Sequence, residues 1–173
     1  MLKYFLIFLL VLWLYFRYVR IIVTFQLLSP KAKKPTRAYH RAACYDFYSI
    51  EPVVIPAGQW REIRTGVAYA AWPHIHIFGL TFTPFGNVAS EILTRSSFAL
   101  KGLRAHLGEI DNDYRGEITV IMHNHRTDHA ITIPAGKKVA QIKFYRVAPV
   151  SLFEVKKLSR SQRGTNGFGS SGE

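Results

Sequence analysis

Two hydrophobic patterns divide the chain, and the first occupies only its opening residues. Residues 4–16 form an unbroken run of 13 apolar side chains, bounded by Lys3 and by Arg17 and Arg20. As a helix this run would be about 20 Å long, against a bilayer hydrocarbon core of roughly 30 Å. Residues 17–28 contain no Ala, Gly or Ser that could form a signal-peptide cleavage site. Residues 1–20 are therefore predicted to be an uncleaved membrane anchor, either inserted or lying in the interface.

Basic residues on either side of this run give the anchor an orientation. Lys3 precedes it, whereas a larger set follows: Arg17, Arg20, Lys31, Lys33 and Lys34. The positive-inside bias then places the rest of the chain on the cytoplasmic (or nuclear) side of the membrane. The alternative is an apolar arm that is buried within the protein or its oligomer.

The second pattern begins at Ile21 and is typical of β-strands. β-branched and aromatic runs are separated by Pro, Gly, Asn and Asp, over residues 21–28, 52–58, 62–72, 74–82, 117–125, 130–136 and 137–147. The only helix expected after residue 20 is a short one over Ser96–Leu103. This pattern predicts an all-β sandwich or jelly roll over residues 21–158. Residues 159–173 are rich in Gly and Ser and are predicted to form a flexible arm.

The composition limits which partners and which cysteine-based sites the chain can have. The chain of 173 residues carries 23 Lys and Arg against 11 Asp and Glu, a net charge of +12, which indicates an anionic partner. The basic residues are spread along the chain without a recognition helix or aromatic platform, so no specific nucleic-acid binding is expected. Cys44 is the single cysteine, which excludes an intramolecular disulfide framework and a CxxC zinc site.

Five short segments stand out in chain order: AACYDFYS (42–49), TRSSFALKG (94–102), GEIDNDYRGEI (108–118), GKKVAQIKF (136–144) and RGTNGFGS (163–170). Together, and at these separations, they resemble the five motifs of the trimeric deoxyuridine triphosphatases (dUTPases), with the resemblance covering about residues 21–173. It implies a jelly-roll-like fold with the apolar N-terminal helix outside it. It also implies the hydrolysis of dUTP to dUMP and pyrophosphate, which limits uracil in DNA and supplies dUMP for thymidylate synthesis.

The third segment is the most specific of the five. By the resemblance, Asp111 orients the water that attacks the α-phosphorus and holds the deoxyribose 3′-OH, while Tyr114 stacks under the sugar and excludes a 2′-OH. The backbone of Gly108, Glu109, Ile110 and Asp111 would meet the uracil edge. From the residues alone, Asp111 could equally cap a turn and Tyr114 could be a half-buried core tyrosine.

Two further segments supply groups suited to phosphate. Arg95, Ser96 and Ser97 open the expected helix turn, where free N–H groups, two hydroxyls and a guanidinium suit a polyphosphate. Their alternative interpretation is an N-cap with a solvent-facing arginine. The resemblance adds Gln141 near the phosphates, and Asp46 as support for a phosphate-bound Mg²⁺, largely through water. Asp46 could otherwise be a turn residue, and Gln141 an ordinary strand residue.

The C-terminal arm contains one aromatic residue, Phe168, between two glycines. By the resemblance the arm closes over the nucleotide: Phe168 stacks on uracil, and Arg163, Gly169 and Ser170 bind the terminal phosphates. The arm would reach a site built by other subunits, so a homotrimer with shared active sites is expected. A base–aromatic stack contributes on the order of 1–3 kcal/mol, enough to order a short arm.

Some positions depart from the family pattern: Cys44 stands where glycine is usual, Thr94 where proline is usual, and residues 74–85 resemble an insertion. We expect Thr94 to loosen the approach to the phosphate site. These departures and the N-terminal run favour a viral or otherwise divergent origin. They also keep open a second hypothesis, a catalytically silent, membrane-tethered interaction protein. The sister enzyme dCTP deaminase shares the Arg-Ser-Ser segment but is not expected to have both the DYRG and GFGS runs.

His123, His125 and His129 lie close together in the sequence and are candidates for a metal site, because alternate residues of a strand share one face. Only Asp128 stands near them in the sequence as a further ligand. The three are therefore interpreted as surface or core histidines.

Overall fold

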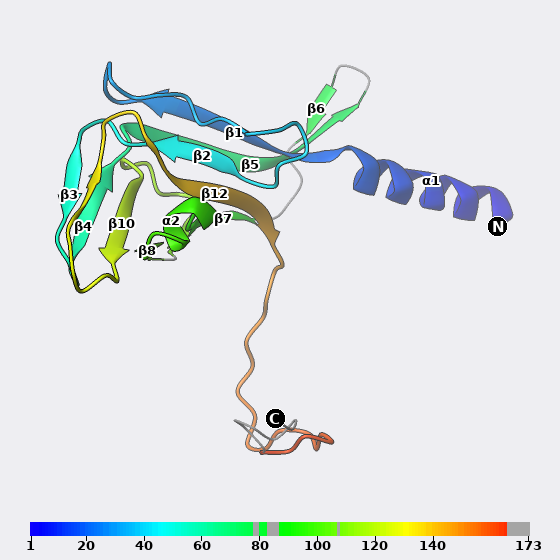
Figure 1. Cartoon of the computed structure of the whole chain (residues 1–173). Helices are drawn as coiled ribbons and strands as arrows, with labels where there is room; N and C mark the ends of the chain where they lie inside the picture. The colour runs from blue at the N-terminus through cyan, green and yellow to red at the C-terminus, as the bar shows by residue number, and fades with distance from the viewer. Residues whose placement is uncertain (78–79, 83–86, 107, 166–173) are drawn as a thin grey trace.

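The computed structural model describes residues 1–77, 80–82, 87–106 and 108–165, with the side chains of residues 14–19 and 74–86 left aside. Helix α1 (Leu2–Tyr18) runs directly into strand β1 (Val19–Leu27). It projects from the β-domain as a separate arm (Figure 1). Its apolar side chains are exposed as far as they are described, from Leu2 at 71% to Trp13 at 58%. The helical part of the N-terminal prediction is confirmed.

The predicted transmembrane helix is not supported. Within the described residues, no helix combines the length and the apolar character that crossing a membrane requires.

The rest of the chain is β-structure, as predicted. One sheet has the order β1-β5-β6 and a second has the order β2-β12-β7-β9, all antiparallel. The strands of these two sheets other than β1 are β2 (Tyr45–Tyr48), β5 (Val67–Ile77), β6 (Leu80–Phe82), β7 (Asn87–Leu93), β9 (Glu109–Ile110) and β12 (Lys138–Val147). The far end of β5 and β6 form a hairpin from the expected insertion, and Figure 1 shows it extending beyond the body.

Two smaller antiparallel sheets complete the domain, in the orders β4-β10-β8 and β11-β3. Their strands are β3 (Val53–Ile55), β4 (Trp60–Arg64), β8 (Leu103–Ala105), β10 (Thr119–Asn124) and β11 (Ile131–Ile133). The core lies between the sheets, because alternate residues of the strands point inward, including Phe47, Ile63, Val120, Met122 and Ile142, each at most 1% exposed. These large apolar side chains fix the sheets that hold the site.

Strand boundaries differ from the sequence prediction at several places. The run over residues 62–72 is not one strand, because Gly66 with φ +67° turns the chain between β4 and β5. Strands β2, β7, β8 and β9 were not predicted, since they are short or mix polar with apolar residues. Helix α2 (Ser96–Ala99) is one turn, shorter than the expected Ser96–Leu103. The all-β class is nevertheless confirmed.

Candidate functional site

A cavity of about 320 Å³ opens beside the predicted motif over residues 108–118. Its lining includes Gly108, Glu109, Ile110, Asp111 and Tyr114, with Ile92, His106, Glu117, Ile118, Thr119 and Ile121 around them. Short strand β9 places the motif by pairing Glu109 with Glu91 and Ile110 with Ser90 of β7. The chain then turns, with the Tyr114 N–H donating to the Asp111 carbonyl oxygen at 3.2 Å. The structure therefore brings the predicted base and sugar residues together.

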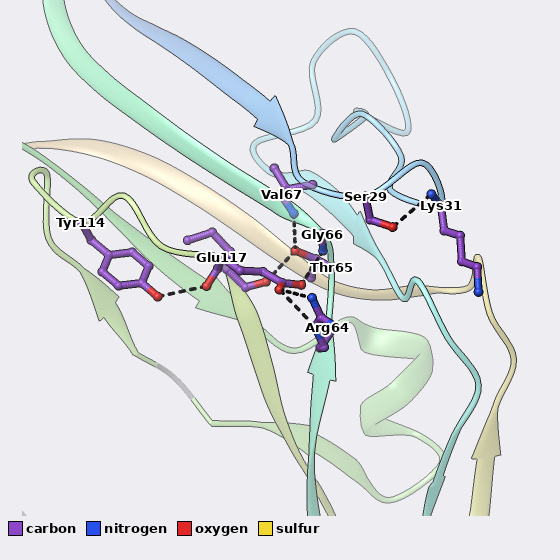
Figure 2. Close-up of polar contacts among 9 residues, drawn as sticks. Ser29, Lys31, Arg64, Thr65, Gly66, Val67, Tyr114 and Glu117 are labelled. Carbon is purple, nitrogen blue, oxygen red and sulfur yellow. Dashed lines mark hydrogen bonds and ion pairs between the residues drawn. The ribbon is translucent and has the colours of Figure 1, made fainter.

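Tyr114 is held over this cavity by the following turn. Its ring is 47% exposed, and its hydroxyl donates to the Glu117 carbonyl oxygen at 3.1 Å (Figure 2). A Cβ on Gly116 would collide with the Tyr114 ring and hydroxyl, so only glycine lets the ring lie there. A Cβ on Gly108 would meet no described protein atom within 4 Å, so the space in front of this glycine is open. An aromatic face and a bare backbone edge thus border the same cavity.

The Glu117 side chain fastens this wall to the turn between β4 and β5. Glu117 Oε2 accepts from Arg64 Nε at 3.1 Å and from Arg64 Nη2 at 2.8 Å (Figure 2). Glu117 Oε1 accepts from the Gly66 N–H at 2.7 Å. Burial favours the neutral acid, but the bonds from Arg64 and Gly66 outweigh it and lower the pKa of Glu117. Thr65 continues the attachment by donating to the Ile118 carbonyl oxygen at 2.5 Å. The sequence did not identify Glu117 as a site residue, because its partners Arg64 and Gly66 are distant from it along the chain.

The polar end of the motif is braced by its own backbone and by β7. Arg115 donates to the carbonyl oxygens of Asn112 at 2.6 Å and Tyr114 at 2.9 Å. The Asn112 side-chain amide donates to the Asn87 side-chain oxygen at 3.2 Å. The Tyr145 hydroxyl contacts the Glu109 carboxylate, which raises the pKa of Tyr145 to about 12. Asp111 itself is exposed, so its carboxylate faces solvent at the mouth of the cavity.

A second cluster gathers the predicted phosphate-side residues around Asp46, whose side chain is only 1% exposed. Arg95 Nε donates to one carboxylate oxygen at 3.0 Å, Lys138 Nζ lies 2.8 Å from the other, and the Gln141 amide donates at 3.3 Å. The hydrogen bond to Asp46 raises the pKa of Lys138. Because one carboxylate faces two cations, the cluster keeps a net positive charge, which suits an anion. Lys138 had not been predicted as a member.

Arg95, Ser96 and Ser97 stand together at the start of α2. Arg95 occupies the N-cap position with extended backbone, no side chain caps the turn, and both serines are exposed. Thr94 does not loosen this segment, contrary to expectation: its hydroxyl accepts from the Ala105 N–H at 2.9 Å and lies 3.3 Å from the Ala105 carbonyl oxygen. A proline could not make these bonds. The hydroxyl ties the start of α2 to β8.

The two clusters lie in one row across the sheet β2-β12-β7-β9. Asp46 pairs with Gln141, Gln141 pairs with Leu93, and the neighbouring Ile92 N–H donates to the Gly108 carbonyl oxygen at 3.3 Å. Three interstrand spacings separate the outer strands, or about 14 Å. Among the described residues, no hydrogen bond or ion pair joins the Asp46 cluster to the Asp111 turn. Each cluster is therefore a separate half of a site.

Metal binding finds little support in these side chains. Asp46 has Arg95 and Lys138 on its two oxygens, so it does not fit as a direct Mg²⁺ ligand. In the described ranges, no three His, Cys, Asp or Glu side chains are arranged to hold a metal ion. His129 contacts Asp128 at 3.1 Å, and His123 instead lies near His125 and His106.

The C-terminal arm is described only in part. Arg163 is exposed. The segment that follows β12 leaves the β-domain as an extended chain (Figure 1). Phe168, Gly169 and Ser170 lie outside the described residues. The apolar side chains of this segment are exposed, with Leu152 at 92% and Phe153 at 85%.

Fold and side chains together define a class: an all-β protein whose candidate site has two halves, one bordered by an aromatic ring and a bare backbone edge and the other with a net positive charge. A family model described as dUTPase matches residues 30–172. The chain belongs to the dUTPase family.

Named relatives agree with this assignment. The chain is 34% identical over 142 residues to a deoxyuridine 5′-triphosphate nucleotidohydrolase of Variola virus, covering 82% of this chain and 87% of the relative. It is 33% identical over 150 residues to the Kluyveromyces lactis protein of that name, covering 86% and 92%. Among solved structures, the Staphylococcus bacteriophage 80alpha dUTPase with dUPNHPP aligns with a TM-score of 0.75 and 25% identity, covering 88% of this chain and 99% of that one.

Proposed function

We propose that this chain hydrolyses dUTP to dUMP and pyrophosphate. The observation that carries the proposal is the cavity beside Gly108, Asp111 and Tyr114, where a bare backbone edge, a carboxylate and an aromatic ring border one space. The named relatives are deoxyuridine 5′-triphosphate nucleotidohydrolases, and the phage 80alpha dUTPase structure contains dUPNHPP. A nucleoside triphosphate is also the kind of anion that the net charge of +12 favours.

In the proposed reaction, Asp111 accepts a hydrogen bond from a water molecule and aims its oxygen at the α-phosphorus. A new P–O bond forms, the bond from the α-phosphorus to the bridging oxygen breaks, and pyrophosphate leaves with the bonding electron pair. The proton of the attacking water passes to Asp111 or to solvent. Asp111 also accepts from the 3′-OH. No side chain acts as nucleophile, so positioning and charge stabilisation lower the barrier.

Specificity is assigned to the wall of the cavity. Tyr114 stacks under the deoxyribose and leaves no space for a 2′-OH, which excludes UTP. The backbone of Gly108, Glu109, Ile110 and Asp111 reads the uracil edge. The open space in front of Gly108 supports this role, because no atom of the described residues lies within 4 Å of where its Cβ would be.

On the phosphate side, Arg95, Ser96, Ser97 and Gln141 bind the triphosphate. Asp46 orients Arg95 and Gln141 by accepting from both. Mg²⁺ is proposed as the cofactor, held by substrate phosphates and water; Asp46 acts on it only through water, since both its oxygens face cations. A phage phi11 dUTPase structure is described as showing coordination of a structural Mg(II) ion.

A homotrimer with shared active sites completes the proposal. The separation of the two half-sites and the exposed apolar residues of the extended C-terminal segment both support a site assembled from several subunits. The arm would bring Phe168 onto the uracil, and Arg163, Gly169 and Ser170 onto the terminal phosphates, of a neighbouring site.

The test is product analysis by ion-pair chromatography on the full chain with Mg²⁺ and dUTP, dCTP, dTTP or UTP in separate reactions. Conversion of dUTP alone to dUMP and pyrophosphate is expected, with loss in Asp111→Asn. Asp113→Asn is the matched control, since Asp113 is exposed in the same turn and has no assigned role. A folded trimer that turns over no dUTP would refute the proposal.

A further inference from the structure

The outward face of the sheet β4-β10-β8 gathers three histidines and one arginine that the proposed reaction does not use. Residues directly opposite in antiparallel strands share a face, and alternate residues along a strand do too. His123 of β10 pairs with Arg104 of β8, and the His106 N–H donates to the Ile121 carbonyl oxygen at 2.8 Å, which places His106 beside the next outward residue. The His125 N–H donates to the Gly102 carbonyl oxygen at 2.8 Å, so His125 continues the column.

These side chains line one open-sided cavity of about 390 Å³, whose lining is Arg104, Ala105, His106, His123 and His125. The rings of His123 and His125 have centroids 4.2 Å apart, and those of His106 and His123 are 6.5 Å apart. Nδ1 of His123 is buried and has no hydrogen-bond partner among the described residues. A water molecule takes up about 30 Å³ of liquid volume, so the cavity has room for a much larger polar group.

The ionisable side chains that line this cavity are all basic. Its lining contains a guanidinium and three imidazoles and no carboxylate. Glu62 of β4 is on the same face but opposite Ile121, and Trp60 is the residue opposite His123. Asp128, in the loop after β10, is bound by Arg126 at 2.9 and 2.8 Å. Among the described residues, no three His, Cys, Asp or Glu side chains are arranged to hold a metal ion.

We propose that Arg104, His106, His123 and His125 form a binding site for a small phosphate-bearing anion, such as inorganic phosphate or pyrophosphate. The Arg104 guanidinium supplies a permanent fork of donors for phosphate oxygens. The imidazole rings of His106, His123 and His125 add ring N–H donors to the same cavity.

The site is distinct from the two half-sites of the proposed reaction, although His106 also borders the base cavity. The inference does not rest on dUTP hydrolysis, and its test reads the histidine rings directly. The full chain, labelled at histidine, is titrated at constant pH with sodium phosphate and separately with pyrophosphate while the imidazole NMR resonances are followed. His123→Gln and His125→Gln assign the resonances.

Saturable shifts of the His123 and His125 resonances are expected with at least one of the anions. Arg104→Gln should weaken binding roughly tenfold, because it removes a charge-assisted donor. The matched control is Arg61→Gln, which removes the same charge from an exposed position on β4 outside the cavity. Arg95→Gln should leave unchanged the anion concentration at which the His123 resonance shift is half complete. That result separates this site from the proposed phosphate half-site.

The proposal is overturned if neither anion moves these resonances, or if Arg104→Gln and Arg61→Gln bind equally well. Turnover of dUTP by Arg104→Gln, measured in parallel, is expected to match that of the unaltered chain.

Discussion

Replacing Glu117 by glutamine tests whether the wall of the base cavity depends on one carboxylate. The substitution keeps the size of the side chain but removes the charge that binds Arg64 and the Gly66 N–H. The Arg64 guanidinium side chain is 53% exposed, so solvent screens its bond and it adds little. The bond from Gly66 is partly buried, and losing its charge-assisted character costs about 1–2 kcal/mol. We expect the free energy of unfolding to fall by that amount.

The assay is urea unfolding followed by tryptophan fluorescence at fixed protomer concentration, because assembly links stability to concentration. With a urea slope of about 2 kcal/mol per molar, the midpoint should fall by roughly 0.5–1 M. Glu62→Gln is the matched control: Glu62 is exposed on the neighbouring strand β4, and its substitution should leave the midpoint nearly unchanged.

The same substitution predicts a pH dependence. The pKa of Glu117 is lowered in the folded chain. Its contribution is therefore fully present above the unfolded value, near 4.3, and is lost as the pH falls through the folded pKa. The stability difference between the unaltered chain and Glu117→Gln should be constant from about pH 6 to 8 and shrink below about pH 4.5. A difference that grows on acidification, or equal effects of Glu117→Gln and Glu62→Gln at neutral pH, would refute the reasoning.

Three further substitutions test other parts of the site. Gly66→Ala should destabilise the fold by about 2 kcal/mol or more in urea unfolding, because a Cβ there is both strained and sterically blocked; Gly58→Ala, equally strained but in open space, should cost only about 1 kcal/mol. Gly116→Ala should displace the Tyr114 ring and raise KM for dUTP, while thermal unfolding stays near that of the unaltered chain; an unchanged KM would argue against a role for the ring. Thr94→Val removes a buried hydroxyl partner and should lower stability by about 1–2 kcal/mol, with unaltered stability as the contradicting result.

Local patterns predicted the all-β class and most of the longer strands. The runs at residues 21–28 and 137–147 became β1 and β12 almost unchanged, because β-branched and aromatic side chains suit a half-buried sheet wherever they occur. The short strands β8 and β9 escaped prediction. Each has only two or three residues, and their pairing with β10 and β7 is decided by neighbours distant in the sequence. The break at Gly66 was missed because residues 62–64 alternate polar and apolar side chains as a strand does, and an apolar run starts directly after the glycine.

The candidate site likewise has a part that local sequence predicted and a part that it did not. The motif around Asp111 and Tyr114 is contiguous in sequence, so its cavity could be expected from the residues and their resemblance to a family. The partners of Asp46 could not be foreseen, because Arg95 and Lys138 are 49 and 92 positions away and meet it only across paired strands. The proximity of His106 and His123 could not be foreseen either, because His106 follows β8 while His123 lies in β10.

By itself, the sequence determined the β-rich class, the apolar N-terminal helix and the chemistry carried within each short motif, since these depend on residue type and on neighbours along the chain. Only the tertiary structure decided that Asp46 is enclosed by cations, that Glu117 fastens the base cavity, and that three histidines share a face with Arg104. Charges and hydrogen bonds act over a few ångströms in space regardless of sequence separation. The register of the sheets brings those groups together.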